Sequence, residues 1–290
     1  MKKRLMAAVL STAMAATMLL TGSISVQAAD AAAANDPAVE LIFTSVSVSG
    51  DSHTEAMYEF ADKVEELSGG SVTCKCYDNG SLFSSENEFD ALLNGDADLA
   101  YISFPTIATQ IPSYSMFASG YLFSSYEHMT SVLNGDIGLN KIRPQIEETL
   151  NIKPLSSFYL GSRVINTREK EINSYDDMNG LLLRMPNSEA WLFLGEALGA
   201  NPTPLSFSEL YTALQTGAVD AQDNPLPSIE SAKFYEVTKY IAITNHVVDS
   251  IMPCINGDTW NSMTEAQQEA VTEAMEYARA VSYTHLTLPT

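Results

Sequence analysis

The chain alternates between short apolar segments and amphipathic helical segments, and this alternation restricts its fold more than any other feature. Residues 41–43 are apolar and predict a first strand, and residues 53–67 carry apolar side chains at helical spacing. Residues 71–77 alternate like a strand, and residues 99–102 form another short apolar strand. This order predicts an α/β domain in which helices cover the faces of a sheet.

A second helix is predicted between the strands at 71–77 and 99–102. The run Ser85-Glu86-Asn87-Glu88 has the pattern of a capping box, in which a serine and a glutamate three residues later satisfy each other's backbone amides. The apolar residues that follow predict a helix that continues to Gly95, where a glycine is suited to end it.

Two segments of the chain resemble each other. Residues 91–98 and 213–220 match in register at Ala, Leu, Gly and Asp, and each predicts a helix end, a glycine stop and a loop into a strand. Internal duplication and chance are both open explanations, because this connection is common in any αβ unit. If the chain has two similar lobes, the loops 103–105 and 223–225 face one another at a crevice of the kind that binds ligands.

Residues 1–28 have the features of a Sec signal peptide: a basic start, an apolar stretch and small residues before Ala28. Residues 29–40 are expected to form a leader before the first strand. Serine stands at position 23, where a lipoprotein would need cysteine, so no lipid anchor is expected. We therefore expect a protein exported to the periplasm or another extracytoplasmic space, and not membrane-spanning after cleavage.

The composition excludes several classes of partner. The chain has 36 acidic and 15 basic residues, a net charge of -21, which argues against binding to nucleic acid or anionic membranes. Cys74 and Cys76 would point to one side of a strand, too far apart for a comfortable disulfide, and a C-x-C without a close histidine is a weak metal signal. We expect three buried thiols, with no metal site and no cofactor.

Arg184 follows the apolar run Leu181–Leu183 and precedes Pro186, so a fixed positive charge stands where a buried strand must stop. Its planar guanidinium can donate to both oxygens of a carboxylate and keeps its charge. The residues alone leave two interpretations open. Arg184 either grips a small carboxylate ligand or pairs internally with Asp176 or Asp177.

An ordered series of motifs runs through the second half of the chain. The motifs are Gly161–Arg163, Ile172–Gly180, Leu181–Pro186, Leu198–Pro204, Phe207–Gly217 and Val219–Pro225. In this order and spacing they resemble the DctP family, the extracytoplasmic substrate-binding proteins of TRAP transporters, and the resemblance extends from about residue 41 to residue 280. It implies a two-lobed periplasmic-binding-protein-like α/β fold that holds an organic acid between its lobes and delivers it to the TRAP membrane permease.

The resemblance also implies roles for individual residues. Arg184 matches the principal carboxylate-binding arginine of the family, Arg163 a second arginine, Asn224 the asparagine of an Asn-Pro loop, and Phe207 an aromatic residue against the ligand. A structural ion pair remains an alternative for Arg163, a turn-forming role for Asn224 and a core position for Phe207. Contacts from the first lobe vary with the ligand in this family, and the candidates there are Ser47, Glu86 and Ser103.

The domain organisation follows from the same resemblance. We expect lobe I at 41–160, lobe II at 161–249, and a return to lobe I with the start of truncated C-terminal helices at 250–280. Residues 281–290 abandon the helical period, end in β-formers and proline, and resemble a translated adapter sequence. We therefore predict that this tail is non-native.

No enzyme motif competes strongly with a binding role. The four histidines lack the HExxH spacing, and no GxSxG nucleophile elbow occurs. An exported hydrolase is the main rival of another class, with His246 as its candidate general base, although a histidine satisfied by hydrogen bonds is the more ordinary interpretation. Among binding proteins, an ABC-type solute receptor is the nearest alternative.

Overall fold

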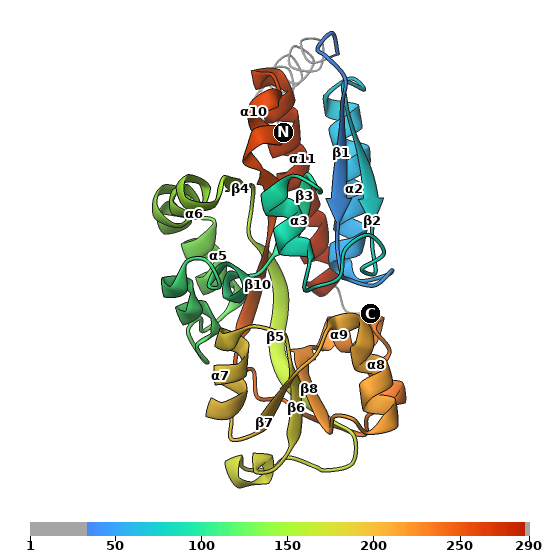
Figure 1. Cartoon of the computed structure of the whole chain (residues 1–290), viewed down its shortest axis with the longest axis vertical. Coiled ribbons are helices and arrows are strands. Elements are labelled where there is room, and N and C mark those ends of the chain that lie inside the picture. The colour runs from blue at the N-terminus through green and yellow to red at the C-terminus, as the bar shows by residue number, and fades with distance from the viewer. Residues whose placement is uncertain (1–33, 288–290) are drawn as a thin grey trace, which may run out of the picture.

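The computed structural model describes residues 34–287, which form a ten-stranded sheet with helices packed around it (Figure 1). The strand order is β2-β1-β3-β10-β5-β8-β6-β7, with β4 paired to β10 and β9 paired to β5. The predicted signal peptide, residues 29–33 of the predicted leader and the last three residues of the chain lie outside the described residues.

The sheet consists of two similar halves. In one half β1 pairs in parallel with both β2 and β3, and in the other β6 pairs in parallel with both β7 and β8. Figure 1 shows these halves as an upper lobe I and a lower lobe II. The predicted two-lobed α/β architecture is therefore present.

Lobe I holds most of the first half of the chain and the C-terminal helices. Its elements are β1 Val39–Thr44, α2 Ser52–Leu67, β2 Val72–Tyr77, α3 Glu88–Asn94, β3 Leu99–Ile102, α4 Phe104–Ile107, η1 Pro112–Ala118, α5 Tyr126–Leu133, η2 Gly138–Ile142, α6 Arg143–Leu150, β4 Ile152–Pro154, α10 Gly257–Ser262 and α11 Glu265–Thr287.

Lobe II is built from the middle of the chain. Its elements are η3 Tyr175–Met178, β6 Leu182–Met185, α7 Glu189–Ala197, β7 Asn201–Pro204, α8 Phe207–Thr216, β8 Ala221–Pro225, α9 Leu226–Ser231, η4 Phe234–Glu236 and β9 Tyr240–Ala242.

Two long antiparallel strands, β5 (Phe158–Thr167) and β10 (Val248–Asn256), connect the lobes. β10 pairs with β3 in lobe I, whereas β5 pairs with β8 in lobe II. The register of the two long strands shifts between Asp249 and Ser250. The predicted lobe boundaries after residues 160 and 249 fall inside these strands and stay predictions.

Each face of the lobe I sheet has its own hydrophobic core. In β3, Leu99 and Tyr101 belong to the cluster under α2 and α11, whereas Ala100 and Ile102 belong to the cluster under α3 to α6. Successive strand residues point to opposite faces, so a strand buried on both sides is apolar at every position. The predicted coverage of both faces by helices is confirmed.

The two segments with matching sequences occupy equivalent places in the two lobes. Gly95 and Gly217 both end a helix in the left-handed conformation, with φ of 78° and 81°. Asp98 then accepts a hydrogen bond from the amide of Ile42 in β1, at 2.8 Å, and Asp220 accepts one from Leu182 at the start of β6, at 3.0 Å. This equivalence favours duplication over chance.

The predicted capping box at Ser85 is wrong. α3 begins at Glu88, and its N-cap residue, Asn87, makes no side-chain capping bond. The hydroxyl of Ser85 donates instead to the carboxylate of Glu86, at 3.1 Å. The Glu88 side chain is buried in the protein and therefore does not cap the helix start.

The prediction that residues 281–290 abandon helical structure is wrong for the part that the structure describes, because α11 continues to Thr287. Helix propagation adds one hydrogen bond for each residue fixed, and tertiary packing supports the added turns. The ring of Tyr283 stacks on Tyr126 with centroids 4.1 Å apart. The non-native origin of the tail stays a prediction.

All three cysteines are free thiols. Cys254 is buried as predicted, but Cys74 and Cys76 are only half-buried. Both lie on β2, which is the edge strand of the sheet in the described part of the chain.

Candidate functional site

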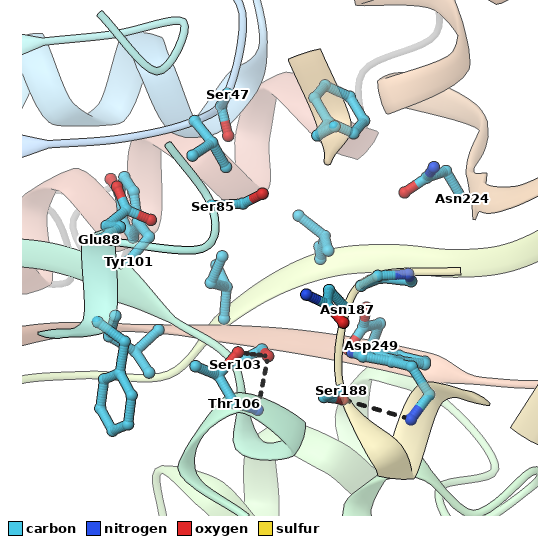
Figure 2. A pocket seen from close by; sticks show the side chains of 18 of the residues that line it. Ser47, Ser85, Glu88, Tyr101, Ser103, Thr106, Asn187, Ser188, Asn224 and Asp249 are labelled. Carbon is cyan, nitrogen blue, oxygen red and sulfur yellow. Dashed lines mark hydrogen bonds between the residues drawn. The ribbon is translucent and has the colours of Figure 1, made fainter. Parts of the chain in front are cut away.

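A cavity of about 380 Å³ lies between the lobes, within the usual range of roughly 300–1,000 Å³ for small-molecule sites. Side chains from β1 to α4 line one side, and side chains from β6 to α9 line the other (Figure 2). The segments predicted as loops at 103–105 and 223–225 lie instead at the start of α4 and in β8, but Ser103 and Asn224 from them do line the cavity. All seven predicted site residues line this cavity: Ser47, Glu86, Ser103, Arg163, Arg184, Phe207 and Asn224.

Arg184 is positioned by the backbone on both sides of its strand. It lies near the end of β6, where it is paired with Gln222 of β8 and Thr203 of β7. Its Nε donates to the carbonyl oxygen of Leu205 at 2.8 Å, which orients the guanidinium. Within residues 34–287 this is the one hydrogen bond that its side chain makes, so both terminal nitrogens are available to a ligand.

Arg184 is a buried cation without a counterion. Its side chain is 3% exposed, and no carboxylate in the described part of the chain forms an ion pair with it. Burial, together with the neighbouring charge of Arg163, lowers the pKa of Arg184 from its ordinary value to about 10. The group stays charged at neutral pH but lacks the partner that a buried charge ordinarily has. The alternative pairing with Asp176 or Asp177 is not observed.

Arg163 differs from Arg184 because the protein neutralises it. Its Nε donates to Asp249 Oδ2 and its Nη1 to Asp223 Oδ1, each at 2.7 Å. Burial acts to lower the pKa of Arg163, but the two carboxylates outweigh it and raise the pKa. The guanidinium also lies over the ring of Trp191, 4.2 Å from its centroid. The structural ion pair considered as an alternative is therefore present, in a side chain that also lines the cavity.

His246 is satisfied on both sides of its ring. Nε2 lies 2.8 Å from Asp223 Oδ2, and Nδ1 lies 2.7 Å from the hydroxyl of Thr244. Its side chain is 0% exposed and is not among those that line the cavity. The interpretation of His246 as a hydrogen-bonded structural residue is confirmed.

Asn224 and Phe207 frame the lobe II side of the cavity. The amide of Asn224 donates to the side-chain oxygen of Gln222 at 2.6 Å, which fixes its orientation. Phe207 is half-buried and packs edge-on against Phe234, with its ring centroid 6.0 Å from the guanidinium carbon of Arg184. Asn224 is thus more than a turn former, and Phe207 is both a packing residue and part of the cavity wall.

The lobe I candidates are less constrained. The hydroxyl of Ser103 caps α4 by accepting from the amide of Thr106, and Ser47 is half-buried near the end of β1. Glu86 is exposed at the mouth. Burial acts to raise the pKa of Glu86, but hydrogen bonds from Ser84, its own backbone and Ser85, with the charge of Arg184, lower it.

Among the cavity residues that were not predicted as site residues are Glu88, Asp51, Asp249 and Trp191. Trp191 packs in the hydrophobic core of lobe II, and its ring also lies under the guanidinium of Arg163. Asp249 lies 86 residues from Arg163, and no local pattern marks that pairing. Glu88 was assigned to helix capping, and its burial depends on tertiary packing.

Residues 34–287 show neither a cluster suited to a metal ion nor a helix suited to span a membrane. No group of three or more His, Cys, Asp and Glu side chains in that range is placed to hold a metal ion. No helix there is long and apolar enough to cross a bilayer.

The fold and the cavity define a class: a two-lobed solute-binding protein whose cleft presents an uncompensated arginine. The chain belongs to the DctP family, because the family model for bacterial extracellular solute-binding protein, family 7, matches residues 43–287. The resemblance seen in the sequence is confirmed. The extracytoplasmic location agrees with this family.

Two bacterial proteins illustrate the sequence similarity. The sialic acid-binding periplasmic protein SiaP of Vibrio cholerae is 33% identical over 216 residues, which cover 74% of this chain and 67% of SiaP. The C4-dicarboxylate-binding protein DctB of Bacillus subtilis is 28% identical over 225 residues, which cover 76% of this chain and 63% of DctB.

Solved structures share the fold. A TRAP periplasmic solute-binding protein from Roseobacter denitrificans with bound 3-deoxy-D-manno-oct-2-ulosonic acid has a TM-score of 0.80 at 38% identity and covers 84% of this chain and 80% of its own. A second protein from that bacterium, with bound L-galactonate, has a TM-score of 0.81 at 30% identity. The match covers 86% of this chain and 82% of that protein. These structures confirm the two-lobed fold and the class of carboxylate-binding transport protein.

Proposed function

We propose that this protein captures a sugar acid or a related small organic acid outside the cytoplasm, with the ligand carboxylate held by Arg184, and delivers it to TRAP membrane subunits. The observation that carries the proposal is the burial of Arg184 in the cleft without a counterion among residues 34–287. The acids bound by the two Roseobacter proteins support this class of ligand.

A carboxylate would supply what Arg184 lacks. The terminal nitrogens would donate two charge-assisted hydrogen bonds, one to each carboxylate oxygen. These bonds would replace the interactions with water that the guanidinium loses on burial. Because water is largely excluded from this position, such bonds are stronger than on an exposed surface. The hydrogen bond to Leu205 fixes the guanidinium before the ligand arrives, which lowers the entropy cost of binding.

Arg163 would assist from the neighbouring strand. Asp249 and Asp223 engage its Nε and Nη1, and no hydrogen bond within residues 34–287 uses Nη2. A rigid guanidinium with one free nitrogen is suited to a single hydrogen bond to the ligand. Asn224 and Phe207 would add an amide and an apolar face, and Ser47, Ser103 and Glu86 would contact the ligand from lobe I.

Closure of the lobes would accompany capture, because a ligand that contacts both lobes favours the closed form by its differential affinity. The closed lobes would then be the form that the permease recognises. Within this scheme we keep the proposed boundaries, with lobe I at 41–160, lobe II at 161–249 and the return to lobe I at 250–280.

A binding role without catalysis is the better proposal. Both nitrogens of His246 are engaged by Thr244 and Asp223, which argues against a role as general base in a hydrolase. Membership of the DctP family favours a TRAP permease over an ABC-type transporter as the partner.

A ligand screen tests the proposal. The purified chain is heated with D-galactonate, D-glucuronate, 3-deoxy-D-manno-oct-2-ulosonic acid and succinate, and native mass spectrometry follows each hit. A bound acid raises the melting temperature because it binds only the folded chain. We expect at least one acid to bind and to be released unchanged. Turnover of a bound acid, or no binding by any acid, would contradict the proposal.

A further inference from the structure

The two sides of the cavity carry opposite charges. The lobe I residues that line it include Asp51, Glu86, Glu88 and Asp90 and no lysine, arginine or histidine. On the other side stands Arg184, the cation that has no counterion within residues 34–287. A ligand that spans the cleft therefore meets a cation at one end and acids at the other.

The four acids differ in what they already contact. Asp51 accepts hydrogen bonds from the backbone amide of His53 and the hydroxyl of Ser231. Glu86 and Asp90 are exposed to solvent, which screens their charge. Glu88 is buried, and no cation within residues 34–287 forms an ion pair with it, so it is the acid whose surroundings point to a ligand.

Glu88 is 5% exposed, and its Oε1 is buried without a hydrogen-bond partner in the described part of the chain. No cation there forms an ion pair with it. Figure 2 shows it beside Tyr101 on the left of the cavity, with Asn187 and Asn224 on the right. A buried polar atom left without a partner in a binding cleft is suited to accept a hydrogen bond from a bound molecule.

The neighbours of Glu88 favour a hydroxyl group over a carboxylate. The same wall presents a set of hydroxyl side chains, and hydroxyls both donate and accept hydrogen bonds. A second carboxylate would face the charges of Glu86 and Asp90, and this wall has no cation to offset the repulsion. The hydroxyl side chains are those of Ser47, Ser85, Tyr101, Ser103, Thr106 and Thr109.

We propose that the lobe I wall, through Glu88, selects ligands with one carboxylate and a hydroxylated far end, and rejects acids that carry a second carboxylate there. This inference rests on the proposed function, because it takes the first carboxylate to be held by Arg184. The inference predicts that this cleft accepts sugar acids with one carboxylate and excludes dicarboxylates.

The protonation of Glu88 is consistent with this role. Burial raises the pKa of its carboxyl well above the ordinary value of 4.5, an effect that Thr44 only partly offsets. A hydroxyl can donate to either protonation state of this group, so ligand binding does not require the carboxyl to be charged.

Matched acid pairs test the selection by isothermal titration. D-gluconate is compared with D-glucarate, and D-galactonate with galactarate, because each pair differs only in whether carbon 6 carries a hydroxyl or a carboxylate; succinate is a further dicarboxylate. We expect the monoacid of at least one pair to bind about tenfold or more tightly than its diacid.

Variants then assign the selection to Glu88. In Glu88→Gln the amide can donate to a carboxylate, so the preference for the monoacid should narrow severalfold while the fold is retained, as checked by circular dichroism. Asp96→Asn is the matched control: it removes the same charge from an exposed position outside the cavity and should leave the preference unchanged.

The outcomes separate this inference from the proposed function. A diacid that binds as tightly as its monoacid, binding of succinate alone, or an unchanged preference in Glu88→Gln would overturn the role of Glu88 and leave Arg184 as the carboxylate site. Failure of every acid to bind would overturn the proposed function itself.

Discussion

Arg163 and Arg184 line the same cavity, but among residues 34–287 only Arg163 has counterions. Arg163 is held by Asp223 and Asp249, whereas Arg184 has the Leu205 carbonyl as its hydrogen-bond acceptor within residues 34–287. The first arginine is therefore part of the folded scaffold, and the second is the position at which the cleft still lacks a negative charge.

Replacement of Arg184 by lysine should abolish most ligand binding. The charge is kept, but one ammonium cannot donate to both carboxylate oxygens in the planar geometry of the guanidinium, so we expect a loss of at least about tenfold in affinity. Isothermal titration with the best acid from the screen measures it. Arg168→Lys makes the same exchange in lobe II away from the cavity and should bind normally. Unchanged affinity in Arg184→Lys would remove the assigned role.

Replacement of Asp223 by asparagine should destabilise the fold. Asp223 joins Arg163 and His246, and removing one partner of a buried ion pair costs about 3–5 kcal/mol. Urea denaturation at pH 7 measures the free energy of unfolding. The exposed Asp176→Asn should change it little. A loss below about 1 kcal/mol in Asp223→Asn would show that the ion pair is not structural.

The contribution of Asp223 should depend on pH. Burial acts to raise its pKa, but Arg163 and His246 outweigh burial and lower it below 3.8. The folded chain therefore binds this proton less tightly than the unfolded chain, and the stabilisation is complete above about pH 4 and lost as the pH falls further. The difference in stability between the wild type and Asp223→Asn should shrink below pH 4. A constant difference down to pH 2 would contradict this assignment.

Glu88 should give the opposite pH signature. Its pKa is raised by burial, so the folded chain binds the proton more tightly, and stability falls as the pH rises through and above 4.5. Glu88→Gln should be more stable than the wild type at pH 7 by on the order of 1 kcal/mol, and the difference should fade below pH 4.5. Thermal unfolding at several pH values measures it. A variant less stable than the wild type at pH 7 would show that Glu88 has a partner in the fold.

Replacement of Ser231 by alanine should favour the open form. The hydroxyl of Ser231, at the end of α9 in lobe II, donates to Asp51 Oδ2 at the start of α2 in lobe I, at 3.1 Å. Loss of this bond should destabilise the closed arrangement of the lobes by about 0.5–1.5 kcal/mol. The affinity for the ligand should therefore fall about twofold to tenfold. Small-angle scattering should show a larger radius of gyration without ligand. Ser262→Ala, on the exposed face of α10, is the control.

Much of the fold was predictable because its signals are local. The helical period at 53–67 predicted α2, and the glycine stop at 95 predicted the end of α3. The paired segments at 91–98 and 213–220 also pointed to equivalent places in two lobes, and Asp98 and Asp220 hold the neighbouring strands alike. The capping box predicted at residues 85–88 was wrong. A capping pattern depends only on four neighbouring residues and contains no information on the tertiary packing that buries the glutamate.

By itself the sequence determined the alternation of strands and helices, the order of motifs that marks the family, and the presence of an arginine at the end of β6. Each of these features depends on the identity and spacing of residues that are close together in the chain. Only the tertiary structure decided which charges are compensated. Arg163 meets Asp249, 86 residues away, Arg184 meets no carboxylate within residues 34–287, and Glu88 is buried on the opposite wall. Ion pairing and desolvation depend on distances across the folded molecule, which no local pattern contains.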